Sequence, residues 1–382
     1  MPCTLLLVHP NSSHSEEYAS AWSGVCVFGG AGRGGRDAEC GAGIAIIADV
    51  DKLGHLHVGR RHTMVKLLTA IMILCLSLVS AVKVMAVDKL APVPYALTRF
   101  DGSEIHYYLD RRGSTKPHPV LILIQGSDCN SVLNNPRIPL IAEVAPSAAV
   151  LLVEKYAITP DLPFNRDISR TDCPAAYRQN NVPEQRVMDY ERVVAELRHS
   201  AASWWNREIF IIGGSEGAEI ALEVAAITPE TSRLIVFGFG SRHFQDDVLQ
   251  SIRYDSKMAA LDESATEEQI AKMQEVFKAA LSDRSSNEII SGYSHAYWAS
   301  MLSMDQLAMF RAVNIPVLAI QGADDHNVSV EGARALMSQL KMRGRTNLEY
   351  KEYPGLDHAF ADREGASHWD RVIDDMSMWL SR

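Results

Sequence analysis

The sequence lacks the excess of basic residues that nucleic-acid-binding proteins carry. Among its 382 residues, Lys and Arg number 37 and Asp and Glu number 47, which gives a formal net charge of −10. A surface of this sign repels phosphate backbones. Hydrophobic residues make up 47% of the chain and charged residues 22%. This composition is that of a globular protein, and it excludes nucleic-acid binding, a mainly disordered or collagen-like chain, and a polytopic membrane protein.

The apolar stretch near the N-terminus is too short to make a good membrane anchor. It runs from residue 67 to 82, whereas a spanning helix needs roughly 20 apolar residues. Met64-Val65-Lys66 precedes it, and small residues occur at 79–81 and 84–86. A basic start, an apolar core and small residues at the cleavage site are typical of a secretory signal peptide. Residues 64–86 therefore predict a signal peptide, export to the periplasm or the medium, and no stable membrane anchor.

Residues 1–63 show no sustained helical or strand period and hold 10 of the 24 glycines. We expect a disordered leader. Because a signal peptide acts at an N-terminus, we hypothesise that translation begins at Met64 and that this leader is not translated; the alternative is a leader before an internal hydrophobic helix.

Gly30-x-Gly32-x-x-Gly35 resembles a dinucleotide fingerprint, but the next apolar run follows too soon for the helix that would hold a pyrophosphate.

Metal-binding patterns and cysteines are scarce. No His-x-Glu-x-x-His-type spacing occurs, and Cys129 and Cys173 are the only two of the six cysteines that follow residue 86. Two cysteines are too few for a structural zinc site, so we expect no metal and no other cofactor. In an exported protein the pair can form a disulfide, and in the cytosol it would more often be buried thiols. Because the chain carries an export signal, we favour a Cys129–Cys173 bridge, with buried free thiols as the alternative.

Apolar runs alternate with helical patterns from residue 95 onward. Two short strands are expected around the Asp101-Gly102 turn. Further strands are expected at 120–124, 148–153, 209–212, 234–239, 317–320 and 348–353, and helices at 184–199, 218–227 and 369–380. Such alternation predicts an α/β fold with a mainly parallel sheet and helices on both faces.

The stretch from about 242 to 309 interrupts this alternation with charged, helical sequence. Thr266-x-x-Gln269 matches a capping box before a run of apolar residues. We expect a helical insertion that covers the site as a lid or cap, with plain extra packing as the alternative. Within it, Tyr293, Tyr297 and Trp298 either line an acyl or aromatic substrate pocket or pack beneath the insertion.

Gly213-Gly214-Ser215-Glu216-Gly217 lies between an expected strand and an expected helix. A G-x-S-x-G sequence at that place predicts a sharp turn that exposes the serine, because side chains at the glycine positions would collide with neighbouring elements. A serine hydroxyl is a poor nucleophile at neutral pH and needs a histidine base that a carboxylate orients. Ser215 is therefore the candidate nucleophile, and its partners should follow later in the chain.

Two later loops supply those partners. Asp325 follows the strand expected at 317–320, where open α/β sheets place their sites, and we prefer it to Asp324. His358 lies on the loop after the last expected strand. His326 is the competing base, but its place beside Asp325 on one loop would prevent the side-on hydrogen bond that orients a triad histidine. The order Ser215, Asp325, His358 results.

Acyl transfer also needs two N–H groups that stabilise the oxyanion. Glu216, directly after the candidate nucleophile and at the start of a helix, offers one. Gln125-Gly126-Ser127 ends the third expected strand, where this arrangement presents the other donor, so we predict Ser127; an ordinary loop is the alternative.

These motifs make the chain similar to the α/β-hydrolase superfamily over most of residues 95–382. The resemblance is carried by Gly213–Gly217, by Gly322-x-x-Asp325-x-x-Val328 and by Gly355-x-x-His358. It is closest to the serine esterase, dienelactone hydrolase and prolyl-peptidase-like branches, whose glycine before the serine matches Gly214. Gln125-Gly126 stands where the family usually has His-Gly, and many lipases have His or Tyr at position 214, so a lipase is disfavoured.

The resemblance implies a serine hydrolase with a small-molecule ester or acyl substrate. A carboxylic ester is our first expectation, and a peptide or an acyl thioester is the second, since one triad serves all of them. A catalytically inactive binding module and a lyase or transferase on the same scaffold remain alternatives from other classes. The sequence leaves the oligomeric state open.

Overall fold

The computed structural model describes residues 90–382 except 114–115, 168–169 and 201–202. The predicted leader and signal peptide, residues 1–63 and 64–86, lie outside the described residues. Among the helices of the described residues, none is both long enough and apolar enough to cross a membrane.

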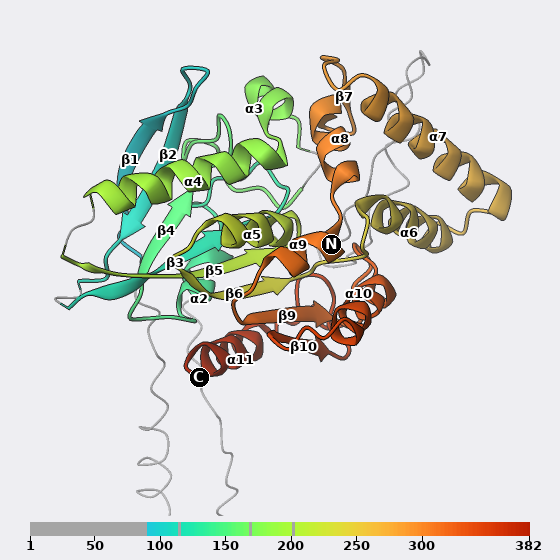
Figure 1. Cartoon of the computed structure of the whole chain (residues 1–382). Coiled ribbons are helices and arrows are strands. Elements are labelled where there is room, and N and C mark those ends of the chain that lie inside the picture. The colour runs from blue at the N-terminus through green and yellow to red at the C-terminus, as the bar shows by residue number, and fades with distance from the viewer. Residues whose placement is uncertain (1–89, 114–115, 168–169, 201–202) are drawn as a thin grey trace, which may run out of the picture. The chain divides into compact units, whose positions relative to one another are not determined.

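A single eight-stranded sheet forms the centre of the fold, in the order β1-β2-β4-β3-β5-β6-β9-β10 (Figure 1). β1 pairs antiparallel with β2, and β2 pairs antiparallel with β4. All the other neighbours in this sheet are parallel. The strands are β1 (Val93–Thr98), β2 (Glu104–Asp110), β3 (His118–Ile124), β4 (Ala149–Val153), β5 (Trp205–Gly214), β6 (Thr231–Phe237), β9 (Val317–Gly322) and β10 (Leu348–Tyr353).

Helices cover both faces of this sheet. The longer helices are α4 (Pro183–Ser200), α5 (Glu216–Ile227), α10 (Val330–Met342) and α11 (Trp369–Leu380), and the short ones are α2 (Arg137–Ala142), α3 (Ala175–Asn180) and α9 (Gln306–Ala312). α4, α5, α9 and α10 share one apolar core with the sheet, and α2 and α11 share the other. The predicted α/β class with a mainly parallel sheet is therefore confirmed.

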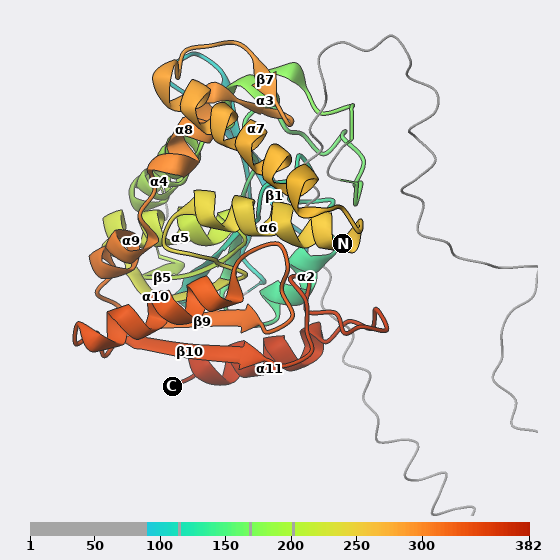
Figure 2. The same ribbon diagram turned by 90° about the vertical axis from the view of Figure 1, so that its right-hand side faces the viewer.

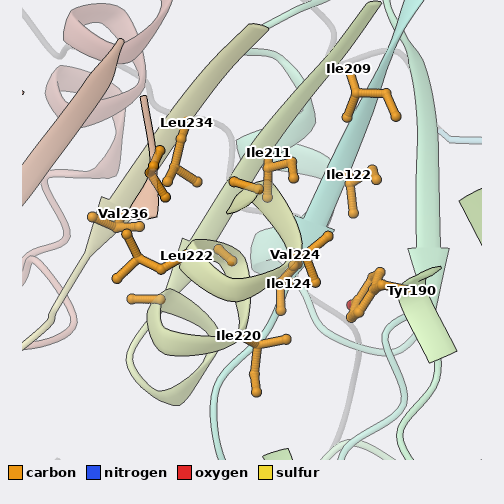
Figure 3. Packing of buried hydrophobic residues seen from close by; sticks show 14 of the residues in the cluster. Ile122, Ile124, Tyr190, Ile209, Ile211, Ile220, Leu222, Val224, Leu234 and Val236 are labelled. Carbon is orange, nitrogen blue, oxygen red and sulfur yellow. The ribbon is translucent and has the colours of Figure 1, made fainter. Parts of the chain in front are cut away.

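Side-chain alternation along β3 shows why the strands read as continuous apolar runs. Ile122 and Ile124 enter the core beneath α4 and α5, whereas Leu121 and Leu123 enter the core on the opposite face. Figure 3 shows the first of these cores, where Ile124 lies near Ile220 and Val224 of α5. Because both faces are buried, every position of a central strand favours an apolar residue.

Between β6 and β9 the chain forms α6 (Phe244–Met258), α7 (Glu263–Ser282), β7 (Ile289–Ile290), β8 (Tyr293–Ser294), α8 (His295–Ser303) and then α9. α6, α7 and α8 share a separate apolar core around Met273 and Trp298. α9, in contrast, packs on the sheet through Leu307 and Phe310. We call residues 244–303 the cap; it lies at one end of the sheet (Figures 1 and 2).

The capping box predicted at Thr266-x-x-Gln269 is wrong. α7 begins three residues earlier, at Glu263, and its N-cap is Asp262, whose carboxylate accepts a hydrogen bond from Ala265 N at 2.8 Å. Thr266 lies inside the helix, where its hydroxyl donates to Asp262 O at 2.9 Å. Aspartate is as good an N-cap as serine or threonine, so the earlier carboxylate sets the helix start.

A disulfide joins Cys129, in the loop after β3, to Cys173, just before α3. The sulfurs lie against buried Ile158 and Tyr177. The bridge closes a loop with a sequence separation of 44 residues. It therefore fastens the segment leading into α3 to the loop that carries Ser127.

Removal of this disulfide is expected to lower the free energy of unfolding by about 4 kcal/mol, because the bridge restricts the unfolded chain. Urea unfolding with and without dithiothreitol would measure the change. The variant in which both cysteines are replaced by serine is the control and should not respond to the reductant. Equal midpoints for the oxidised and reduced wild-type protein would contradict the expectation.

Candidate active site

Ser215 lies between the end of β5 at Gly214 and the start of α5 at Glu216. Its backbone has φ 55° and ψ −135°, a conformation that L-residues with a side chain rarely adopt. Ser215 N donates to Phe237 O at 2.9 Å, which ties the turn to the end of β6. Strain of this kind persists only where surrounding contacts enforce it, and it is common at functional sites.

The three glycines around Ser215 are each required by a close contact. A Cβ on Gly213 would lie 2.1 Å from Gly217 O, and a Cβ on Gly217 would lie 2.3 Å from Ile124 O. A Cβ on Gly214 would lie 2.1 Å from the ring of Phe237. The glycine before the serine therefore makes room for an aromatic ring of β6.

His358 and Asp325 meet although they come from different loops. Asp325 follows β9 and His358 follows β10, and His358 Nδ1 lies 2.7 Å from Asp325 Oδ2. The Asp325 carboxylate is fully buried, whereas the His358 side chain is 20% exposed. The structure thus brings these two predicted residues within hydrogen-bond distance.

Further hydrogen bonds hold the Asp325 carboxylate in place. Gln321 Nε2 donates to Oδ2 at 2.7 Å, and the backbone N–H groups of Asn327 and Val328 donate to Oδ1 at 2.8 and 3.2 Å. Sequence reasoning missed Gln321. Its signal was a polar residue at the end of an otherwise apolar strand, four positions before the aspartate.

The two competing residues have other partners. Asp324 accepts a hydrogen bond from exposed Arg363 at 3.0 Å. The ring of His326 stacks on Tyr254 of α6, with centroids 3.9 Å apart. Asp324 therefore does not orient a histidine, and His326 is not paired with a buried carboxylate as His358 is.

Ser215 and His358 both lie at the carboxyl end of β6. Ser215 N bonds to Phe237 O, and the next residue, Gly238, has φ +61° and would place a Cβ 2.9 Å from His358 Cε1. The loop after β3 reaches the same place, since a Cβ on Gly126 would lie 3.0 Å from Ser215 Cβ. The predicted nucleophile, base and oxyanion loop therefore converge.

Glu216 and Ser127 flank Ser215 from different elements. Glu216 is the first residue of α5, so its N–H is one of the donors that a helix leaves unpaired at its start. Ser127 follows Gly126, and its carbonyl accepts hydrogen bonds from the hydroxyls of Tyr177 at 3.0 Å and Tyr293 at 3.2 Å. These tyrosines, from α3 and β8, were not assigned to the oxyanion site from the sequence.

The environment of His358 favours its protonated form. Burial of the imidazole lowers the pKa of His358, but the charge of Asp325 and its hydrogen bond raise it more, so the pKa lies above its ordinary value.

Within the described part of the chain, His, Cys, Asp and Glu side chains nowhere gather into a group of three that could hold a metal ion.

Residues 270–380 match the prolyl oligopeptidase family. The matched stretch runs from α7 to the end of α11 and includes Asp325 and His358. It leaves out the Ser215 turn and six of the eight strands of the central sheet, β1 to β6.

Solved structures of esterases and peptidases resemble the chain. A carboxyl esterase from Bacillus coagulans is 16% identical and superposes on 77% of this chain and 99% of its own, with a TM-score of 0.51. An esterase from Pyrococcus furiosus is 14% identical over 77% of this chain and 90% of its own, with a TM-score of 0.50. An acylaminoacyl peptidase from Pyrococcus horikoshii is 13% identical over 78% of this chain and 42% of its own, with a TM-score of 0.49.

The likeness to the two esterases establishes the α/β-hydrolase fold that the sequence motifs predicted. The strand order, the antiparallel position of β2 and the turn at Gly213–Gly217 are the features of the described residues that agree with it. The chain therefore has the α/β-hydrolase fold, and its C-terminal part is similar to the prolyl oligopeptidase family.

Proposed function

We propose that this protein is an exported esterase that cleaves a carboxylic ester through Ser215, His358 and Asp325. The observation that carries the proposal is the 2.7 Å contact between His358 Nδ1 and the buried Asp325 carboxylate, next to a strained serine turn. The signal-peptide pattern at 64–86 supports export.

In this mechanism Asp325 accepts the Nδ1–H of His358 and so leaves Nε2 free to accept the Ser215 proton. Ser215 Oγ attacks the ester carbonyl, and the N–H groups of Glu216 and Ser127 stabilise the tetrahedral oxyanion. His358 then gives its proton to the departing alcohol, which leaves an acyl-enzyme. Water, activated by the same histidine, releases the carboxylic acid and restores Ser215.

A peptidase or an acyl thioesterase is the alternative, and the match of residues 270–380 to the prolyl oligopeptidase family favours the peptidase. An inactive binding module fits less well, because such a module has no need of a buried carboxylate hydrogen-bonded to a histidine beside a strained serine.

A matched substrate panel separates these functions. The purified protein would be assayed with a p-nitrophenyl ester, an acyl thioester and a peptide p-nitroanilide, each alongside Ser215→Ala. We expect the highest kcat/KM with the ester and no turnover by the variant. Preference for the anilide would favour the peptidase, and turnover by Ser215→Ala would contradict the mechanism.

The pH dependence of kcat/KM should show an acidic limb from His358. The imidazole must be neutral to act as a base, so activity rises as the pH passes its pKa. Because that pKa is raised from its ordinary value of 6.5, kcat/KM should reach half its maximum at a pH above 6.5. In Asp325→Asn the burial that lowers the pKa remains while the raising charge is lost, so the limb should move to lower pH. An unchanged limb in that variant would contradict the pairing.

A further inference from the structure

Two stacked tyrosines of the cap make hydrogen bonds to both sides of the oxyanion site. Tyr293 of β8 and Tyr297 of α8 have ring centroids 4.2 Å apart. The Tyr293 hydroxyl donates to Ser127 O at 3.2 Å, and the Tyr297 hydroxyl donates to Glu216 Oε2 at 2.7 Å. The hydroxyls of these two stacked tyrosines therefore contact the two residues whose N–H groups would stabilise the oxyanion.

Arg186 of α4 links the same two sides from behind. Its Nη1 donates to Glu216 Oε1 at 2.5 Å, and its Nη2 donates to Gln125 O at 2.7 Å, two residues before Ser127. Both carboxylate oxygens of Glu216 are thus occupied, one by the arginine and one by Tyr297. A single guanidinium bridges the start of α5 and the end of β3.

This network is buried, so the loss of one partner cannot easily be compensated by water. Arg186 is 3% exposed, Glu216 is 5% and Tyr297 is 3%. Burial raises the pKa of Tyr297 well above its ordinary value, and the nearby Glu216 charge adds to this, so the hydroxyl keeps its proton and remains a donor. Removing the hydroxyl would leave a buried carboxylate oxygen without its partner.

We propose that Tyr293 and Tyr297 are positioning residues that hold the Ser127 and Glu216 backbone in the geometry the oxyanion requires. The proposal rests on the proposed function. It makes the cap a part of the catalytic machinery, because a segment more than 70 residues from Glu216 along the chain fixes the donor there. Plain packing under the cap is the competing interpretation, and it would depend on the rings and not on the hydroxyls.

Phenylalanine substitutions separate these interpretations, because they keep the rings and remove only the hydroxyls. For Tyr297→Phe we expect kcat for ester hydrolysis to fall about tenfold while KM changes less than about twofold, because the affected donor acts on the transition state. The inhibition constant of an alkylboronic acid, which forms a tetrahedral adduct with an active serine, should rise by a similar factor. Tyr293→Phe should act in the same direction through Ser127.

Tyr350→Phe provides a matched control. The Tyr350 hydroxyl also donates to a glutamate, Glu352, at 2.7 Å, but on β10. This variant should keep the wild-type kcat and boronate affinity. Rates would be expressed per active site titrated with a fluorophosphonate, so that a loss of folded protein does not count as a loss of kcat.

The outcomes distinguish the two claims. If Ser215→Ala is inactive but Tyr293→Phe and Tyr297→Phe retain wild-type kcat and boronate affinity, the positioning role is overturned and the esterase proposal stands. An equal fall in the Tyr350→Phe control would also overturn the positioning role, because the effect would then be unspecific. If Ser215→Ala remains active, both proposals fail.

Discussion

Asp325→Asn is expected to lower kcat for ester hydrolysis by about 10⁴-fold. The asparagine amide can donate to His358 Nδ1, which favours the tautomer with its proton on Nε2. In that tautomer Nε2 already carries a proton, so it cannot accept the proton of Ser215. The loss should appear in kcat, measured by initial rates at saturating ester, because the substituted side chain is buried behind the histidine and away from bound substrate.

Asp324→Asn is the matched control for this effect. Asp324 is the preceding residue on the same loop, but its carboxylate pairs with exposed Arg363. Surface ion pairs of this kind contribute little, so the control should keep its kcat within about twofold. Equal losses in the two variants would mean that the loop is sensitive as a whole and that Asp325 has no special role.

Gly213→Ala is expected to destabilise the protein by more than about 4 kcal/mol or to prevent folding. The added Cβ would lie 2.1 Å from Gly217 O, a backbone atom of the first turn of α5, and 2.6 Å from Ala221 Cβ. Neither atom can move without shifting the helix. Chemical denaturation, or the yield of folded protein if none survives, would measure the effect.

Gly344→Ala tests whether space or conformation is the cause. Gly344 follows α10 and has φ +79°, and a Cβ added there would meet no heavy atom of the described residues within 4 Å. Its substitution should therefore cost only the conformational strain of about 1–2 kcal/mol. A cost for Gly213→Ala no larger than this would contradict the crowding at the Ser215 turn.

The strands and the order of the three site residues could be predicted because their signals are local. Ser215 has glycines on both sides in a strand-to-helix turn, and Asp325 follows the short apolar run 317–320. His358 follows the strand expected at 348–353, where Leu348, Tyr350 and Tyr353 are interspersed with charged residues. Buried parallel strands produce such runs wherever both faces of a sheet are covered. The sequence therefore placed each residue at the same edge of the sheet before any distance was known.

α10 was missed although its signal was present. Ser329 is its N-cap, and buried Val330, Ala333, Leu336 and Leu340 recur at helical spacing. α2 and α3 were missed for a different reason, since six residues are too few to establish a period.

The Arg186–Glu216–Tyr297 network could not be predicted from local patterns. Arg186 and Tyr297 lie on helices that are far apart in sequence, and Glu216 reads as an ordinary acidic residue in the first turn of a helix. Only the packing of the cap against α4 and α5 brings the three together. A buried carboxylate directly after the nucleophile becomes informative once its partners are known.

The most direct test of the account is covalent labelling of Ser215. The wild-type protein and Ser215→Ala would be treated with a fluorophosphonate probe and analysed by intact mass. We expect one adduct per wild-type chain and none on the variant, because His358 and Asp325 activate this serine alone. A folded wild-type protein that stays unlabelled, or a variant that is labelled as well as the wild type, would contradict it.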